Sequence, residues 1–433
     1  MKFLYFLFAF SLLFCFSCSK LDVSNQATPS TSGIKFYGDQ YGEVLRSFEQ
    51  TQDGGYMFGG YTSTSNYFGG GREGFIQKSD KSGNVVWYKT YGGAGLVNIF
   101  DVVHQTSDGG FIAAGSTSSN GYYSSLAYLV KTDKYGEKIW EKTFLGDTLG
   151  AYFFDVKEMP DHGFAAVGFS NANAENPLLV VKTNQSGDSL WTKQYVVKKN
   201  YQTLNASLAI GPNGEIAIAS MTQPLHQNLR ILSIQYPTFT YLSPNGNLLI
   251  PHLIDTIFGS MPYYYLRSPV NCEKIISRPD GFIFIFASSP QGPNPNMPTC
   301  SNCGISLSIT IFKIDFNGNV SWHQTYTGMG SGAVINDAKN NPGGGLLISG
   351  STTDAAGINY CWLLNTDESG RLTHENFIPI KDYTSWSDAA GAINNDNSMT
   401  IGVNLIPNFA NHEGFFGFFT TDLNGKIIEK TNQ

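Results

Sequence analysis

Four aspartates recur at similar places in a pattern that repeats along the chain, and their carboxyl groups are the first candidates for chemistry. They are Asp101, Asp155, Asp337 and Asp388. Carboxylate oxygens gathered from several repeats can hold Ca²⁺, and a pair of carboxyl groups can cleave a glycosidic bond. A structural role stays open beside these two, in which each carboxylate accepts backbone N–H groups and joins neighbouring repeats. We predict no cofactor, with Ca²⁺ as the alternative.

Aromatic side chains form the second candidate set, and they lie in long segments of variable composition that connect predicted strands. These segments are 62–73, 118–126 and 258–269. An exposed Tyr or Phe can stack on a sugar ring or anchor a protein partner. The alternative is that the rings pack locally over neighbouring strands. The residues are Tyr67, Phe68, Tyr122, Tyr123, Tyr263, Tyr264 and Tyr265.

Cysteines supply a third candidate set in the fifth repeat. Cys300 and Cys303 form a C-x-x-C pair in a long Pro- and Asn-rich segment, and Cys272 precedes an apolar run of the same repeat. In an oxidising compartment these three are disulfide candidates whose pairing is open. A Cys₄ zinc site, which needs Cys361 as well, is the alternative.

Motifs of several large enzyme classes are absent from the sequence. It holds no HExxH, no GxSxG and no phosphate-binding loop, and its 7 histidines lack the spacing of metal ligands. The net charge is −7 with no stripe of Lys and Arg, so nucleic acid is not a predicted partner. Carboxylates from different repeats leave no local motif, so an enzyme acting on extracellular polysaccharide stays an open alternative.

The first residues predict export and lipid attachment. The apolar run from Phe3 to Phe16 is too short to span a bilayer as a helix but suits a signal peptide, residues 1–17. It ends in Ser17 and Cys18, which resembles the lipobox of bacterial lipoproteins. That resemblance implies acyl chains, palmitate among them, on Cys18, and a place at the outer membrane. Residues 18–33 then form a flexible tether.

Two motifs recur with a period near fifty residues, and they define the elements that must position the candidates. One is a turn before an apolar run, as in SDGGFIAAGS (107–116); the other is D-x-x-G before an aromatic residue, as in KTDKYGEKIW (131–140). Short apolar or alternating runs between Gly-rich turns predict strands, four to each repeat. One such sheet cannot bury both faces, whereas seven in a ring can. We therefore predict an all-β, seven-bladed propeller over residues 34–433.

The combination of YLVKTD, K-T-Y-G-G and D-G-G-F-I-A-A-G-S-T resembles the bacterial seven-bladed propeller repeat, and the D-x-x-G-x-x-x-W core is similar to the tryptophan-docking motif of quinoprotein-like propellers. The resemblance implies the fold and carries no site residues over. KFYG (35–38) matches K-T-Y-G of the other repeats, so the N-terminal segment is predicted to complete the last blade and close the ring.

The turns suggest which face is functional. The Asp-Gly-Gly and D-x-x-G hairpins are short and uniform and share one face, whereas the variable segments lie on the other, where binding residues tend to occur. The four aspartates are expected near the starts of the innermost strands, at the channel mouth on that loop-rich face. We predict a lipid-anchored binding module for a glycan or a protein, either a monomer or part of an envelope complex. A polysaccharide lyase or hydrolase and a structural subunit of an envelope assembly are the alternatives.

Overall fold

The computed structural model describes residues 35–38, 42–63, 71–92, 97–118, 125–144, 150–171, 176–225, 234–253, 263–264, 273–288, 308–328, 331–341, 344–354, 356, 358–379, 383–385, 390–393, 398–407 and 415–422. The predicted signal peptide and tether, with Cys18, lie outside these residues. Among the described residues, no helix has the length and apolar character needed to cross a membrane.

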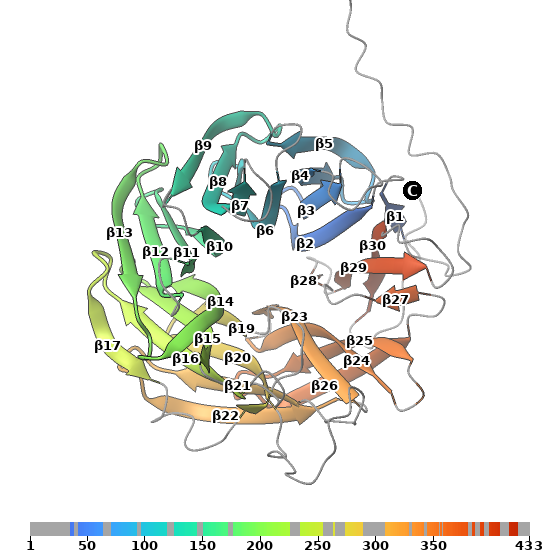
Figure 1. The fold of residues 1–433 in the computed structure, drawn as a ribbon. Helices are drawn as coiled ribbons and strands as arrows, with labels where there is room; N and C mark the ends of the chain where they lie inside the picture. Colours follow the sequence, from blue (N-terminus) through green and yellow to red (C-terminus); the bar gives the residue numbers. More distant parts are fainter. Residues whose placement is uncertain are drawn as a thin grey trace, which may run out of the picture.

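In this part of the chain every regular element is a β-strand, and the strands form blades around a central axis (Figure 1). Each blade is an antiparallel meander that runs from the axis outward. One eight-stranded sheet contains two meanders joined by a single parallel bridge, Arg72 to Val97. Divided at that bridge, the described strands make up seven four-stranded blades, with short β18 and β27 as additions. The predicted all-β propeller of antiparallel blades is confirmed.

The first four blades follow one another around the ring. Blade 1 holds β2 (Glu43–Gln50), β3 (Tyr56–Ser63), β4 (Arg72–Ser79) and β5 (Val85–Tyr91). Blade 2 holds β6 (Val97–Gln105), β7 (Phe111–Ser118), β8 (Ser125–Thr132) and β9 (Lys138–Phe144). Blade 3 holds β10 (Ala151–Glu158), β11 (Phe164–Ser170), β12 (Leu178–Thr183) and β13 (Ser189–Tyr195). Blade 4 holds β14 (Tyr201–Ile210), β15 (Ile216–Pro224), β16 (Ile234–Leu242) and β17 (Leu248–Leu253), with β18 (Tyr263–Tyr264) beside β16.

The remaining blades complete the circle. Blade 5 holds β19 (Glu273–Arg278), β20 (Gly281–Ser288), β21 (Ser308–Ile314) and β22 (Val320–Thr327). Blade 6 holds β23 (Ser331–Asn340), β24 (Leu346–Thr353), β25 (Asn359–Thr366) and β26 (Leu372–Pro379). Blade 7 holds β28 (Ala390–Ile393), β29 (Met399–Pro407), β30 (Phe415–Thr421) and β1 (Lys35–Tyr37), with β27 (Tyr383–Ser385) beside β29.

The ring closes through its N-terminal strand, as the KFYG match predicts. β1 pairs antiparallel with β30, with Lys35 opposite Phe418 and Tyr37 opposite Phe416. The Tyr37 ring is buried and packs against Phe58, Phe416 and Phe418. The first and last described strands therefore share one blade, and no covalent link is needed to hold the circle.

The repeated Asp-Gly-Gly hairpins are fixed by their own side chains. Asp53 Oδ1 accepts the Gly55 N–H at 3.0 Å, and the buried Lys78 of β4 reaches Asp53 Oδ2 at 2.9 Å. Lys131 pairs with Asp108 in blade 2 and Lys182 with Asp161 in blade 3 in the same way. The recurrence of Lys in K-T-D and Asp in D-G-G is thus one ion pair repeated blade by blade.

The outer strands of blades 1, 2, 3, 5 and 7 are joined to the D-x-x-G turn of the next blade. The Trp87 ring lies over Gly136, where φ is +75° and an added Cβ would come within 2.8 Å of the ring. Tyr91, four residues later, donates its hydroxyl to the Gly136 carbonyl at 2.8 Å. The same Tyr-to-Gly hydrogen bond joins Tyr37 to Gly83, Tyr195 to Gly246 and Tyr326 to Gly370. The period of the sequence is therefore the period of these interfaces.

Candidate functional site

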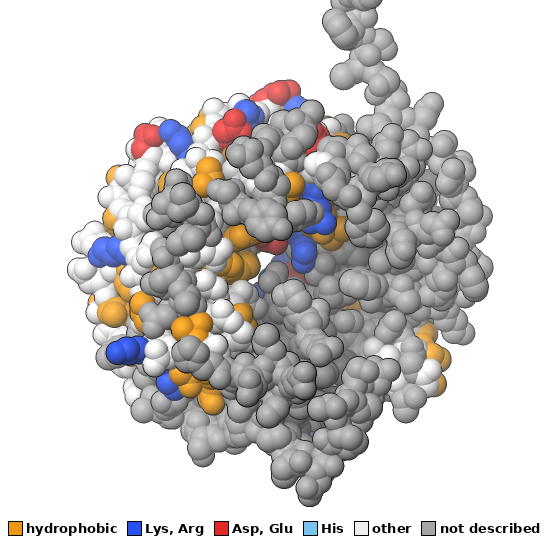
Figure 2. Space-filling view, viewed as in Figure 1, with side chains coloured by type: hydrophobic (Ala, Val, Ile, Leu, Met, Phe, Trp, Pro, Cys, Tyr) orange, Lys and Arg blue, Asp and Glu red, His pale blue; other side chains and the backbone are white. Residues whose placement is uncertain are grey.

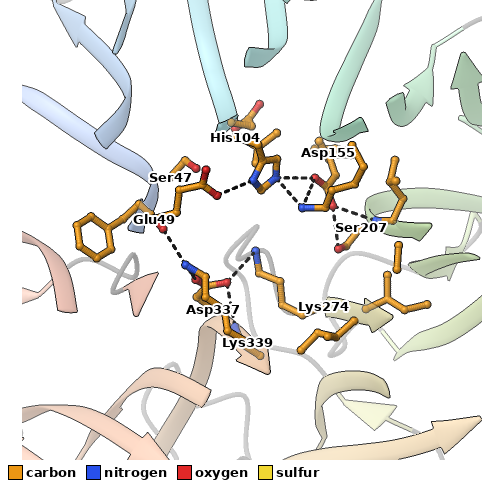
Figure 3. Close-up of a pocket in the computed structure, with 18 of the residues that line it drawn as sticks. Ser47, Glu49, His104, Asp155, Ser207, Lys274, Asp337 and Lys339 are labelled. Carbon is orange, nitrogen blue, oxygen red and sulfur yellow. Dashed lines mark hydrogen bonds and ion pairs between the residues drawn. The ribbon is translucent and has the colours of Figure 1, made fainter. Parts of the chain in front are cut away.

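A cavity of about 530 Å³ lies on the axis of the ring, lined by β2, β6, β10, β14, β19 and β23 (Figure 3). Figure 2 shows basic and acidic side chains in the opening at the centre of the molecule. Each of these strands is the innermost strand of its blade. One edge forms backbone hydrogen bonds with the second strand of the blade, and the other edge faces the axis. The side chains of the unpaired edge decide what the channel can bind.

One register position carries an ionisable side chain on four of the blades. Glu49, His104, Lys157 and Lys339 each lie opposite the second residue of the following strand in blades 1, 2, 3 and 6. The equivalent residue of blade 4 is Ala209, opposite Ala217. The cavity wall is therefore charged on several blades and apolar at β14, where Ala209 and Ile210 line it, and at Ile275 and Ile276 of β19.

A chain of polar contacts connects three blades across this wall. His104 Nδ1 lies 3.0 Å from Glu49 Oε2, and His104 Nε2 lies 2.6 Å from Lys157 Nζ and 3.4 Å from Asp155 Oδ1. Glu49 Oε1 also accepts the backbone N–H of Gln105. The imidazole of His104 therefore lies between the Glu49 carboxylate on one side and Lys157 and Asp155 on the other. His104 is thus oriented from both sides, by blade 1 and by blade 3.

Asp155 is saturated with donors and joins blade 3 to blade 4. Its Oδ2 accepts Ser207 Oγ–H at 3.1 Å and the Leu208 N–H at 3.0 Å, and its Oδ1 accepts the Val156 N–H at 2.8 Å. Burial by itself raises the pKa of this carboxyl. The charge of Lys157 and the bonds from His104 and Leu208 outweigh burial and hold the pKa well below its usual range.

Glu49 behaves in the same way between blades 1 and 2. Burial by itself raises the pKa of Glu49. The hydrogen bond and charge of His104, the charge of Lys339 and the Gln105 N–H lower it by more, so the pKa of Glu49 lies below its usual value. Lys339 belongs to blade 6 and donates to the Phe48 carbonyl of blade 1 at 3.1 Å. That bond passes from β23 to β2 across the axis side of blade 7.

Asp337 forms the opposite corner of the cavity. Its Oδ2 lies 3.2 Å from Lys339 Nζ, and its Oδ1 accepts the Ala338 N–H at 2.9 Å and lies 4.0 Å from Lys274 Nζ. One carboxylate is therefore shared between two ammonium groups, one from its own strand and one from β19.

The structure brings three of the four predicted aspartates to one cavity. Asp101, Asp155 and Asp337 line it, and Asp388 lies outside the described residues. The expected position near the strand starts is wrong: Asp101 and Asp155 lie in the middle of β6 and β10, and Asp337 lies toward the end of β23. The strands begin earlier than expected, so the acids fall farther along them.

Most of the predicted aromatic and cysteine residues lie outside the described part of the chain. Tyr263 and Tyr264 form β18, paired with β16. The predicted residues that lie outside the described part of the chain are Tyr67, Phe68, Tyr122, Tyr123, Tyr265, Cys272, Cys300 and Cys303. Cys361 is a buried free thiol in β25, and burial raises its pKa to about 12. No group of three His, Cys, Asp or Glu side chains within the described ranges is arranged to hold a metal ion.

Sequence reasoning found Asp101, Asp155 and Asp337 but missed the other ionisable residues of the cavity. They are Arg46, Glu49, His104, Lys157, Glu158, Lys274 and Lys339. A signal for four of them was present, because aligning the repeats on the hairpin turns places Glu49, His104, Lys157 and Lys339 in one column. Ordinary charged residues in a column carry no motif, so only the ring geometry shows that they converge.

Comparison with solved structures finds the same fold. The structure is similar to a lectin, BP39L from Burkholderia pseudomallei, with a TM-score of 0.55, 10% identity, and coverage of 89% of this chain and 98% of that one. It is similar to an ulvan lyase of polysaccharide lyase family PL25, with a TM-score of 0.51, 8% identity, and coverage of 90% and 98%. No protein-family model matches the sequence, and no curated protein matches it. The class defined by fold and comparison is the β-propeller.

Proposed function

We propose that this protein is a lipid-anchored propeller of the bacterial cell envelope that binds a glycan in its axial cavity. The observation that carries the proposal is the cavity itself, about 530 Å³ in volume with polar side chains contributed by several blades. Ligand sites in proteins have this size, and they combine apolar walls with a few convergent polar groups. The cavity has both, because Ala209 and Ile276 line it together with Lys274 and Asp337.

The comparisons are in keeping with a glycan ligand without defining one. One similar propeller is described as a lectin and another as a polysaccharide lyase. The lipobox-like Ser17-Cys18 supports an envelope location, since an acylated Cys18 would hold the propeller at a membrane surface where glycans are abundant.

A second candidate is turnover of the bound polysaccharide, and one observation favours it. His104 lines the cavity and contacts Glu49, Asp155 and Lys157, so several side chains able to transfer protons lie together there. Incubating the protein with polysaccharides and measuring new reducing ends separates binding from cleavage. Product that forms with the wild type and disappears with His104→Gln would favour the enzyme.

The binding proposal is tested with the full-length protein purified in detergent on a glycan array. Specific retention of one glycan class supports it, and no retention of any glycan contradicts it. The anchor is tested separately by feeding radiolabelled palmitate to the expressing cells. Label in the wild type and none in Cys18→Ser is the expected outcome, and label in both proteins would contradict lipidation at Cys18.

A further inference from the structure

Lys274 differs from the other charged residues of the cavity in how little holds its ammonium group. Within the described residues, its ammonium group pairs with Asp337 Oδ1 alone, at 4.0 Å, which is longer than a hydrogen bond. Lys157 and Lys339, by contrast, have acceptors at 2.6 Å and 3.1 Å. Figure 3 shows the Lys274 side chain extending from β19 into the space between the His104 side and the Asp337 side of the cavity.

Lys274 and Lys339 share the carboxylate of Asp337, whose Oδ1 also accepts the Ala338 N–H. The charge of Lys339 also acts on Glu49, whereas Asp337 is the one carboxylate within 4.0 Å of Lys274 among the described residues. A partly enclosed ammonium group without a close acceptor loses hydration and gains little in return. An anionic group of a ligand placed beside Lys274 would supply that acceptor, and charge-assisted hydrogen bonds are stronger than neutral ones.

The two strands nearest Lys274 in the ring, β14 and β19, contribute apolar residues to the cavity as well as Asn205, Ser207 and Ser277. Ile275 and Ile276 of β19 and Ala209 and Ile210 of β14 line the same cavity. A ligand that fits this wall presents C–H groups toward blades 4 and 5 and an anionic group toward blade 6. A pyranose ring with an acidic substituent has both features, because one face of the ring is built of C–H groups.

We propose that the axial cavity selects acidic saccharides, and that Lys274 is the residue that recognises their anionic group. This inference rests on the proposed glycan function and names the substrate class. A uronate carboxylate and a sulfate ester have the same recognition chemistry at an ammonium group, so both are included and the experiment separates them.

The test is isothermal titration of the full-length protein in detergent with three probes: galacturonic acid trisaccharide, a sulfated galactose trisaccharide and neutral galactotriose. The wild type is expected to bind at least one acidic probe. Lys274→Met is expected to weaken that binding about tenfold, the equivalent of one charge-assisted hydrogen bond. Lys274→Arg, which retains the charge, should recover most of it. Lys142→Met, at the outer rim in β9, is the matched control and should bind as the wild type does.

The outcomes separate this inference from the proposed function. Binding of an acidic probe that Lys274→Met weakens and Lys274→Arg restores supports it, and the better acidic probe identifies carboxylate or sulfate. Equal binding of neutral galactotriose, or equal affinity in Lys274→Met, overturns the inference and leaves glycan binding intact. If glycans are retained on the array but neither acidic probe binds in the titration, the inference is also overturned. Retention of no glycan at all contradicts both, as does preference for an acidic peptide such as oligo-Asp. Melting curves check that each variant is folded.

Discussion

Truncating Tyr37 should weaken the closure of the ring and lower the melting temperature. The side chain is 5% exposed, packs against three Phe rings of blades 1 and 7, and donates its hydroxyl to the Gly83 carbonyl at 2.5 Å. Removing a buried aromatic ring costs about 3 to 5 kcal/mol of unfolding free energy. Removing the hydroxyl alone, as in Tyr37→Phe, costs about 1 kcal/mol.

These costs convert into measurable shifts. An unfolding entropy of about 2.1 cal/mol/K per residue gives roughly 0.8 kcal/mol/K for a propeller of about 400 residues. Tyr37→Ala should therefore lower the melting temperature by about 4 to 6 °C, and Tyr37→Phe by about 1 °C. Differential scanning calorimetry, with urea unfolding as a second measure, resolves both values.

Two comparisons make the result specific to ring closure. Tyr135→Ala removes the same side chain at a turn where it is 61% exposed, so its unfolding free energy should stay within about 0.5 kcal/mol of the wild type. Phe144 of β9, the residue at the corresponding place in blade 2, lacks a hydroxyl altogether, which shows that the ring can carry the interface. An unchanged melting temperature in Tyr37→Ala would refute closure through β1.

Three further predictions concern the blade interfaces. Asp155→Asn should lower the unfolding free energy by about 2 kcal/mol at pH 7, because a charged acceptor for Lys157, Ser207 and Leu208 is lost. Because the folded pKa of Asp155 is depressed, that contribution is present above the unfolded pKa of about 4 and is lost as the pH falls further, so wild type and variant should converge in acid urea titrations. Gly370→Ala should destabilise more than Gly54→Ala in urea: both have positive φ, but an added Cβ at Gly370 would come within 2.4 Å of the Trp322 ring, whereas at Gly54 it meets nothing within 4 Å. The Cys361 thiol, with its pKa raised to about 12 by burial, should resist iodoacetamide at pH 8 until the protein unfolds, as peptide mass spectrometry would show; rapid native labelling would contradict its burial.

The fold was readable from the sequence because its interfaces repeat. The same contact between a Trp ring and a turn glycine occurs three times: Trp87 over Gly136, Trp140 over Gly187 and Trp191 over Gly246. Each contact needs Gly at positive φ and an aromatic residue at a fixed spacing, so the sequence records it as a motif. The KFYG match worked for the same reason, since Tyr37 makes the bond to Gly83 that Tyr91 makes to Gly136.

The site was only partly readable. The inward-facing column changes from Glu49 to His104, Lys157 and Ala209 as the ring turns, so no period marks it. Asp155 and Asp337 could be predicted because Asp recurs at that place in the repeat. How far along the innermost strands they lie could not be predicted. Strand starts depend on how far the preceding blade-to-blade link extends, and that link has no repeated sequence.

The cavity therefore combines two kinds of charged residue that mutation can separate. Asp155 and Glu49 are buried, have depressed pKa values and accept backbone N–H groups of the next blade, so their first role is to join blades. Replacing them leaves buried donors without acceptors and should cost stability. Lys274 makes no short contact within the described residues, so replacing it should cost little stability. If the axial cavity binds an acidic ligand, stability and affinity should thus respond to different residues: stability to Asp155, and affinity to Lys274. A Lys274→Met variant that unfolds as readily as Asp155→Asn would show that this division of roles is wrong.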